Sequence, residues 1–181
     1  TSFDAAIDLA GPPAAWRLGQ LTASASLSSY DALGLARQVG IVSSEVELAG
    51  GARLAVTLAG TPEKGLDATF DGTFGGLTLG SKGRLSVAAE TPPSYRGELT
   101  IASADIDPLA RMIGLAIPGL EAGAGAELAG KVVAIGLAAD VEFANATVAG
   151  RRVGGRLAFA PAAAGGLSVS GSLDLDDLDL G

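Results

Sequence analysis

The chain has 181 residues with a net charge of −8 at pH 7, and it contains neither cysteine nor histidine. Its residues are 48% hydrophobic but only 4% aromatic and 18% charged, so the composition argues for one folded domain and against disorder. Without cysteine there is no disulfide framework and no thiolate metal site. The 12 Lys and Arg residues form no run, so the electrostatic signature of nucleic-acid binding is missing.

The apolar residues are spread over short segments. No stretch approaches the roughly 18 consecutive apolar residues of a membrane helix, and the longest candidate is residues 132–139. This distribution suits many short strands, and any second apolar face would have to meet something other than water. The chain opens in a strand pattern with no initiator methionine and no signal-like segment, so we expect a fragment of a longer protein.

Alternation of apolar and polar residues dominates the chain and predicts β-strands. In chain order the alternating segments are residues 3–9, 46–48, 54–58, 66–70, 77–79, 85–87, 99–101, 141–143, 157–159, 167–169 and 173–175. Glycine and proline clusters that predict turns lie at 50–51, 61–65, 75–76, 81–83, 91–94, 149–151 and 161–166. Short links between consecutive strands imply hairpins and therefore an antiparallel meander.

Two segments have helix signals. Asp107 and Pro108, followed by an apolar run and Gly114, fit an N-cap, a first-turn proline and a C-terminal glycine. Residues 30–40 read similarly, with Asp31 as the candidate cap. Both helices are too short to be stable alone, so their apolar faces must pack on the sheet.

The helix segments also reveal an internal repeat. Residues 35–41 read LARQVGI and residues 109–115 read LARMIGL, an offset of 74 residues (109 − 35). The same offset links 97–101 to 171–175, whereas Gly-Arg-Leu recurs at 83–85 and 155–157 with an offset of 72, which predicts a two-residue deletion. We expect one β-repeat domain over 1–181, with copies at about 19–96 and 97–170 and a third beginning at 171–181.

The acidic tail is the strongest candidate for a metal site. Asp174, Asp176, Asp177 and Asp179 could supply carboxylate oxygens to Ca²⁺. Leucines flank these aspartates, and the glycine turn and polar spacing of a calcium loop are missing. The pattern favours a strand that slips by one residue at Asp176 and Asp177.

The other candidate sites are weaker. Residues 125–132 read GAELAGKV and resemble a phosphate-binding loop, but the hydroxyl residue that would hold Mg²⁺ is missing and a chance match is favoured. Residues 145–147 match a glycosylation sequon, and Trp16 is expected to pack in the core or at its rim. Arg37 and Arg111 recur at equivalent repeat positions and could bind a phosphate head group, although a solvated helix face is favoured.

A catalytic role is not expected. Without histidine or cysteine the chain lacks the usual general base, nucleophilic thiol and metal ligands, so we predict a non-enzyme with no catalytic, cofactor-binding or metal-binding residues. Residues that would contact a lipid are not identified by the sequence.

The repeat resembles a known family. The L-x-L-x-x-L-x-L pattern at 173–180, and GELTIASADIDPLARMIGL at 97–115, look like the C-terminal repeats of AsmA-family proteins, which are similar to TamB and to bridge-like lipid transfer proteins. The resemblance covers the chain from about Gly19 onward. It implies an all-β chain with short helices in which repeated antiparallel strands form a curved, open groove. A closed β-sandwich is the alternative fold.

The resemblance also implies a function. Members are anchored in the inner membrane of Gram-negative bacteria, extend into the periplasm and are connected with lipid transport and outer-membrane biogenesis. The expected partners are phospholipid acyl chains in the groove and a membrane reached by regions outside this chain, with self-association possible through the sheet edges. The alternatives are a structural β-repeat or interaction module, and an assembly scaffold for outer-membrane proteins.

Overall fold

A computed structural model gives the fold of residues 1–11, 13–38, 50–87, 90–112, 123–162 and 167–175. Ten strands and four short helices follow one another along the described chain. The strands are β1 (Ser2–Ala10), β2 (Gln20–Ser29), β3 (Ala52–Thr61), β4 (Gly65–Phe74), β5 (Leu77–Ser86), β6 (Ser94–Ser103), β7 (Ala126–Ile135), β8 (Ala138–Val148), β9 (Arg151–Pro161) and β10 (Leu167–Leu175). The helices are α1 (Ala32–Gln38), α2 (Asp107–Met112) and the 3-10 turns η1 (Pro13–Ala15) and η2 (Pro62–Lys64).

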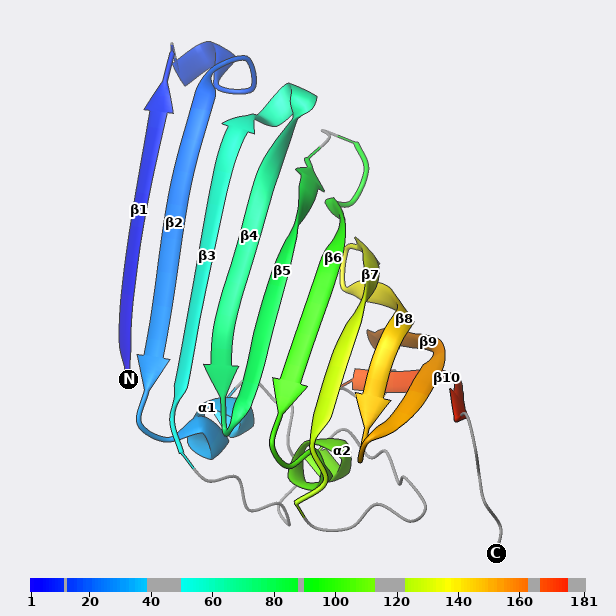
Figure 1. Cartoon of the computed structure of the whole chain (residues 1–181). Coiled ribbons are helices and arrows are strands. Elements are labelled where there is room, and N and C mark those ends of the chain that lie inside the picture. Colours follow the sequence, from blue (N-terminus) through cyan, green and yellow to red (C-terminus); the bar gives the residue numbers. More distant parts are fainter. Residues whose placement is uncertain (12, 39–49, 88–89, 113–122, 163–166, 176–181) are drawn as a thin grey trace, which may run out of the picture.

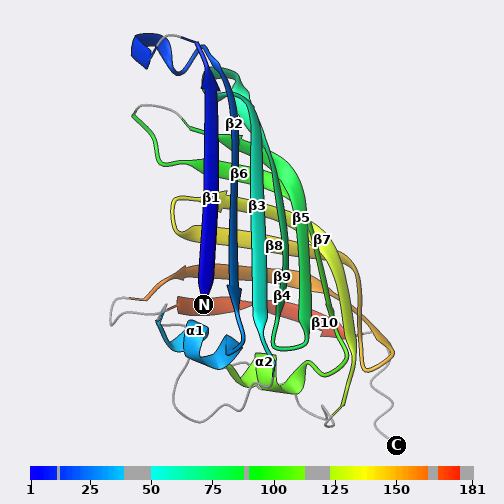
Figure 2. The same ribbon diagram turned by 90° about the vertical axis from the view of Figure 1, so that its left-hand side faces the viewer.

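The ten described strands form one antiparallel sheet in strict sequence order, from β1 to β10 (Figure 1). The predicted open meander is confirmed, and the closed sandwich is not formed by the described strands. Figure 2 shows β1 to β4 standing upright while β8 to β10 lie across behind them, so the sheet is strongly twisted and curved. The turns η1 and η2 lie at one end of the sheet, the turn end, and α1 and α2 lie at the other, the helix end.

The register sorts the alternating side chains onto two faces. Phe3 lies opposite Leu27, which lies opposite Leu54, and apolar residues continue across the sheet in this way. Their neighbours along each strand, such as Asp4 and Ser26, lie on the other face. A sheet with one apolar and one polar face is typical of antiparallel meanders with only one side covered.

Both short helices begin at a repeated turn. Ser29 Oγ accepts a hydrogen bond from Asp31 N–H at 3.2 Å, and Ser103 Oγ accepts one from Asp105 N–H at 3.3 Å, 74 residues later. Asp31 caps α1 as predicted, because its Oδ1 accepts a hydrogen bond from Gly34 N–H at 2.8 Å.

The predicted cap of the second helix is wrong. Asp105 is the repeat equivalent of Asp31, and its Oδ1 accepts the Asp107 N–H at 3.1 Å. Asp107 is the first residue of α2, and its carboxylate pairs with Arg111 at 2.8 Å. The sequence favoured Asp107 because Pro108 follows it, but the preceding Ser-x-Asp turn decides where the capping oxygen lies. The expected terminal Gly114 is outside the described residues.

The repeat seen in the sequence is also present in the structure. Strands β2 and β3 recur as β6 and β7 with an offset of 74 residues at both ends. Backbone bonds at the helix end recur too: Ala32 N–H donates to Gly50 O, and Ile106 N–H donates to Ala124 O. The predicted copy boundaries at 96/97 and 170/171 fall inside β6 and β10.

Two compensating changes distinguish the copies. The β3–β4 link has three residues, Pro62–Lys64, whereas the β7–β8 link has only Gly136 and Leu137. The missing residue is restored by a bulge in β8, where the register shifts between Phe143 and Ala146. The offset is therefore again 74 at the next turn, where Gly76 corresponds to Gly150. The Gly-Arg-Leu match at an offset of 72 consequently joins positions that are not structurally equivalent.

The predicted turn at Ser81, Lys82 and Gly83 is also wrong. These residues lie within β5, which continues from Leu77 to Ser86. Gly83 pairs with Gly97 in β6, and a Cβ atom on Gly83 would lie 2.6 Å from the Gly97 Cα. This glycine therefore permits a close approach of two strands and does not reverse the chain. The predicted strand at 46–48 is outside the described residues.

Candidate functional site

The apolar face of the sheet is the most extensive chemically uniform surface of the described chain. Four rows of register partners cross all ten strands, and Ser81 and Tyr95 are their only polar residues. One such row consists of Phe3, Leu27, Leu54, Gly72, Leu79, Ile101, Leu128, Ala146, Val153 and Leu175. These four rows contain no charged residue, so nothing in them resists contact with hydrocarbon.

The two polar side chains in these four rows form hydrogen bonds. The hydroxyls of Ser81 and Tyr95 are 2.6 Å apart, and Ser81 Oγ donates to the Glu98 carbonyl at 2.7 Å. Tyr95 lies against the glycine of β6, since a Cβ on Gly97 would be 2.8 Å from its ring carbon Cζ. The aromatic side chain therefore covers backbone that glycine leaves bare, and its hydroxyl does not leave an unpaired polar group on the apolar face.

The larger of the two clusters of buried residues lies on this face at β8 and β9. Val141, Phe143, Ala146 and Val153 are only 4 to 6% exposed and form one cluster. Leu99 of β6 packs against this cluster although β7 lies between β6 and β8. Gly130 of β7 lies between Leu99 and Phe143 in the same row, so the side chains of β6 and β8 can meet over a position that has no side chain.

Glycines on the apolar face allow neighbouring strands to come close together. A Cβ on Gly130 of β7 would be 3.3 Å from the Cα of Phe143, and one on Gly171 of β10 would be 3.0 Å from the Cα of Leu157. Most side chains in these positions would hold the strands apart, so glycine allows a closer approach of the two backbones.

The same face is open at β1. Phe3 and Ile7 occupy apolar-face positions, yet their exposed fractions are 68% and 76%. No described strand pairs with the outer edge of β1. The apolar surface therefore runs from an enclosed region at β8 and β9 to an uncovered edge at β1.

The first helix covers the face at the helix end. Ala32 and Leu35 of α1 are buried with Ala52 of β3, and Phe74 and Leu77 pack against them. Ile106, just before α2, joins the same cluster. The predicted packing of the short helices on the sheet is confirmed for α1, which closes one end of the apolar surface.

The polar face carries an alternating ladder of charges. Neighbouring register partners across β5 to β9 are Lys82, Glu98, Lys131, Glu142 and Arg156. Opposite charges on adjacent strands attract across the ladder, and solvent screens exposed pairs of this kind. This face is suited to water, so the two sides of the sheet have opposite solvent preferences.

The residues singled out in the sequence do not form a chemical centre in the described chain. Asp174 is exposed on β10, and the other tail aspartates lie outside the described residues. Most of residues 125–132 form β7, which pairs with β6 and β8, so no phosphate-binding loop exists there. Arg37 is exposed and Arg111 pairs with Asp107.

The remaining two candidates lie apart from each other. Trp16 is 42% exposed beside η1, with the Arg17 guanidinium carbon 5.3 Å from its ring centroid, so it is not a core residue. Asn145 lies at the β8 bulge, next to the buried Ala146. The turn beside η1 and the bulge of β8 are therefore two separate places in the described chain.

A cavity of about 840 Å³ lies over the polar face between β6 and β10. Glu127, Arg152, Asp174, Thr100 and Thr147 are among its lining residues. It lacks a nucleophile with an adjacent base and has no aromatic side chain in its lining, so it offers no catalytic arrangement. Within the described ranges, no three His, Cys, Asp or Glu side chains are grouped closely enough to hold a metal ion.

None of the described helices is both long and apolar enough to cross a membrane. Comparison with protein-family models, with curated proteins and with solved structures gave no match, so the site is interpreted from its own geometry.

Proposed function

We propose that the chain is a non-enzymatic, periplasmic segment of an AsmA-like protein, whose apolar face carries phospholipid acyl chains in lipid transport or outer-membrane biogenesis. The full-length protein would be anchored in the inner membrane by regions outside this chain. The observation that carries the proposal is the set of four uncharged apolar rows, continuous across ten strands and uncovered by a second layer in the described chain.

The dimensions fit hydrocarbon chains. Strands about 4.8 Å apart give a row of ten a length of about 43 Å along the sheet, whereas each acyl layer of a bilayer is about 15 Å thick. A chain lying along the rows gains about 0.8 kcal/mol for each buried CH₂ group. Because the rows offer almost no hydrogen-bond partners, this contact is non-directional and permits sliding.

Native mass spectrometry of the protein purified without detergent tests the proposal. We expect co-purified phospholipid, and we expect Val56→Asp to lose it because the charge enters an apolar row of β3. Thr57→Asp is the matched control, since Thr57 is the next residue on the same strand and is exposed on the polar face. A folded protein without phospholipid, or equal lipid loss in both variants, would contradict the proposal.

The uncovered edge of β1 favours a second candidate function, an interaction module or a scaffold for assembling outer-membrane proteins. Phe3 and Ile7 lie on this edge strand, which contains no proline and no bulge in its pairing with β2. An added strand would pair with the edge of β1 and cover these side chains. In this case Ile7→Asp would prevent the association, whereas Val56→Asp would leave it intact.

A further inference from the structure

Four of the seven large hydrophobic side chains that are exposed in the described chain lie at the turn end of the sheet. Trp16 and Leu18 lie in the β1–β2 link, with exposed fractions of 42% and 65%. Ile135 and Leu137 lie at the β7–β8 turn, with exposed fractions of 57% and 82%. These four residues are not part of the four apolar rows. Trp16, Leu18 and Leu137 lie in links, and Ile135 lies at the end of β7 on the polar face.

The turns at this end are held to one another in pairs. Glu63 N–H of η2 donates to the Arg17 carbonyl at 3.0 Å, which joins the β3–β4 turn to the β1–β2 link. Gly136 N–H donates to the Pro93 carbonyl at 2.9 Å, which joins the β7–β8 turn to the β5–β6 link. The exposed apolar residues are therefore presented from turns with fixed neighbours.

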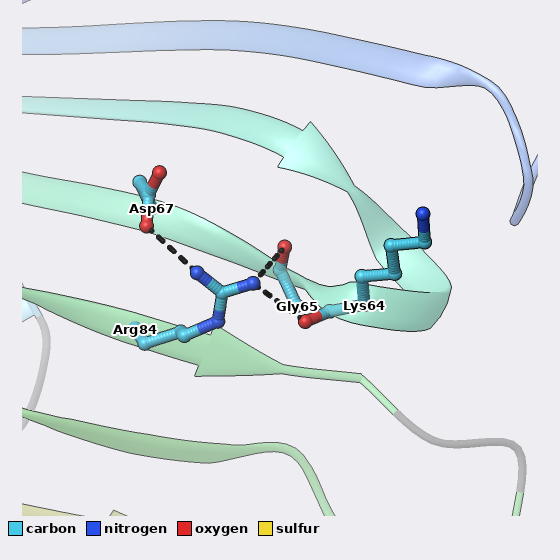
Figure 3. Close-up of polar contacts among 4 residues, drawn as sticks. All are labelled: Lys64, Gly65, Asp67 and Arg84. Atoms are coloured by element: carbon cyan, nitrogen blue, oxygen red, sulfur yellow. Dashed lines mark hydrogen bonds and ion pairs between the residues drawn. The ribbon is translucent and has the colours of Figure 1, made fainter.

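Arg84 adds a further restraint at the turn end (Figure 3). Its Nη2 donates to the Lys64 carbonyl at 2.6 Å, and its Nη1 donates to Asp67 Oδ1 at 3.2 Å. The first bond satisfies a carbonyl at the end of η2, where Gly65 has a φ of 93°. The arginine thus fixes η2 to β5.

The charges of the turn end are balanced. Its described links contain Arg17 and Lys64 together with Glu63 and Glu90. Arg17 stacks on Trp16, which places a cation and an amphipathic ring side by side. Tryptophan, leucine and flanking cations are the residues that enter the boundary between head groups and acyl chains of a bilayer.

We propose that the turn end docks on the surface of an electrically neutral phospholipid bilayer, with Trp16, Leu18 and Leu137 entering the interface. A bilayer suits this surface because its hydrophobic residues occupy separate projecting turns, and a fluid interface can accept each turn independently. The net charge of −8 disfavours an anionic surface, whereas zwitterionic head groups impose no such repulsion. This contact is separate from the acyl-binding face and does not depend on it.

The single tryptophan makes the docking directly measurable. We expect the Trp16 emission to shift to the blue when the protein is titrated with phosphatidylcholine vesicles, and we expect the protein to float with them in a density gradient. Vesicles that contain phosphatidylglycerol should bind more weakly. Unshifted emission without flotation would overturn the proposal, and stronger binding to the anionic vesicles would overturn the assigned neutral surface.

Substitutions separate this surface from the rest of the sheet. Leu18→Asp and Leu137→Asp should each weaken flotation by at least about tenfold, because each removes one buried leucine from the interface. Tyr30→Asp is the control, since Tyr30 is a fully exposed aromatic residue at the opposite, helix end of the sheet, directly after β2. Equal flotation of the Leu18, Leu137 and Tyr30 variants would overturn the proposal.

Val56→Asp distinguishes docking from acyl-chain binding. If both proposals hold, this variant loses co-purified lipid but still floats with vesicles. Flotation without co-purified lipid in the unmodified protein would reject the proposed function and support docking. Co-purified lipid without flotation would support the proposed function and overturn docking.

Discussion

Strands β1 and β8 carry the same alternation of apolar and polar residues but differ in how deeply their apolar side chains are buried. Phe3 on β1 is 68% exposed, whereas Phe143 on β8 is 6% exposed. Both residues occupy apolar-face positions. The difference arises because β8 has a bulge and lies beside glycines that let strands approach, while β1 has a regular ladder with a partner on only one edge. The position of a strand in the sheet, more than hydrophobicity, therefore determines which apolar residues form a core.

The largest expected effect comes from the same substitution on β8 and on β1. Phe143→Ala should lower the free energy of unfolding by about 3–4 kcal/mol, because it leaves a cavity within the cluster of β8 and β9. Phe3→Ala should change it by less than about 0.5 kcal/mol, as expected for an exposed side chain. Urea unfolding followed by circular dichroism measures both values, and similar losses would mean that the two ends are equally buried.

A second test replaces a residue of the second copy by its counterpart in the first copy. Gly130 of β7 corresponds to Val56 of β3, at an offset of 74 residues. Gly130→Val should destabilise the fold by about 1–3 kcal/mol, because the added side chain meets the backbone of β8. Ala129→Val, the neighbouring change on the exposed polar face, should cost less than about 0.5 kcal/mol. If the glycine has no packing role, both variants will have the same denaturant midpoint.

The third test compares the starts of the two helices. Asp31→Ala removes the bond to Gly34 N–H and should cost about 1 kcal/mol. Asp107→Ala removes only the pair with Arg111 one turn away and should cost about 0.3–0.5 kcal/mol. Thermal unfolding of both variants checks the order. A larger loss for Asp107→Ala would indicate that Asp107 is the cap after all.

A fourth test compares two ion pairs on the polar face. Arg84→Ala should cost at most about 1 kcal/mol, and Arg156→Ala should cost less, because both pairs are exposed. Arg84→Ala loses the bonds to the Lys64 and Gly65 carbonyls as well as the carboxylate partner, whereas the side-chain bonds of Arg156 within the described residues go to Asp140. Part of the Arg84 effect should therefore persist in 1 M salt, while the Arg156 effect should vanish. Complete loss of both effects in salt would show that the carbonyl contacts contribute nothing.

The alternating pattern predicted most strands because successive side chains of a strand lie on opposite faces, one apolar and one polar. The errors occurred where local signals have two meanings. Glycine at Gly83 was assigned to a turn, although it serves a close contact between β5 and β6. Asp107 was assigned as a cap because Pro108 follows it, but Asp105 and Ser103 form the turn. The pairing of Tyr95 with Ser81 was missed, and its only trace in the sequence is a tyrosine two residues before Gly97.

The sequence by itself determined the antiparallel meander, the 74-residue repeat and the apolar composition of one face, because these follow from local alternation, turn residues and spacing. Only the tertiary structure decided where that face closes and where it stays open. Closure depends on how closely neighbouring strands approach, which is set by a one-residue bulge in β8 and by glycines from different strands. Such contacts join residues distant along the chain, so no local pattern records them.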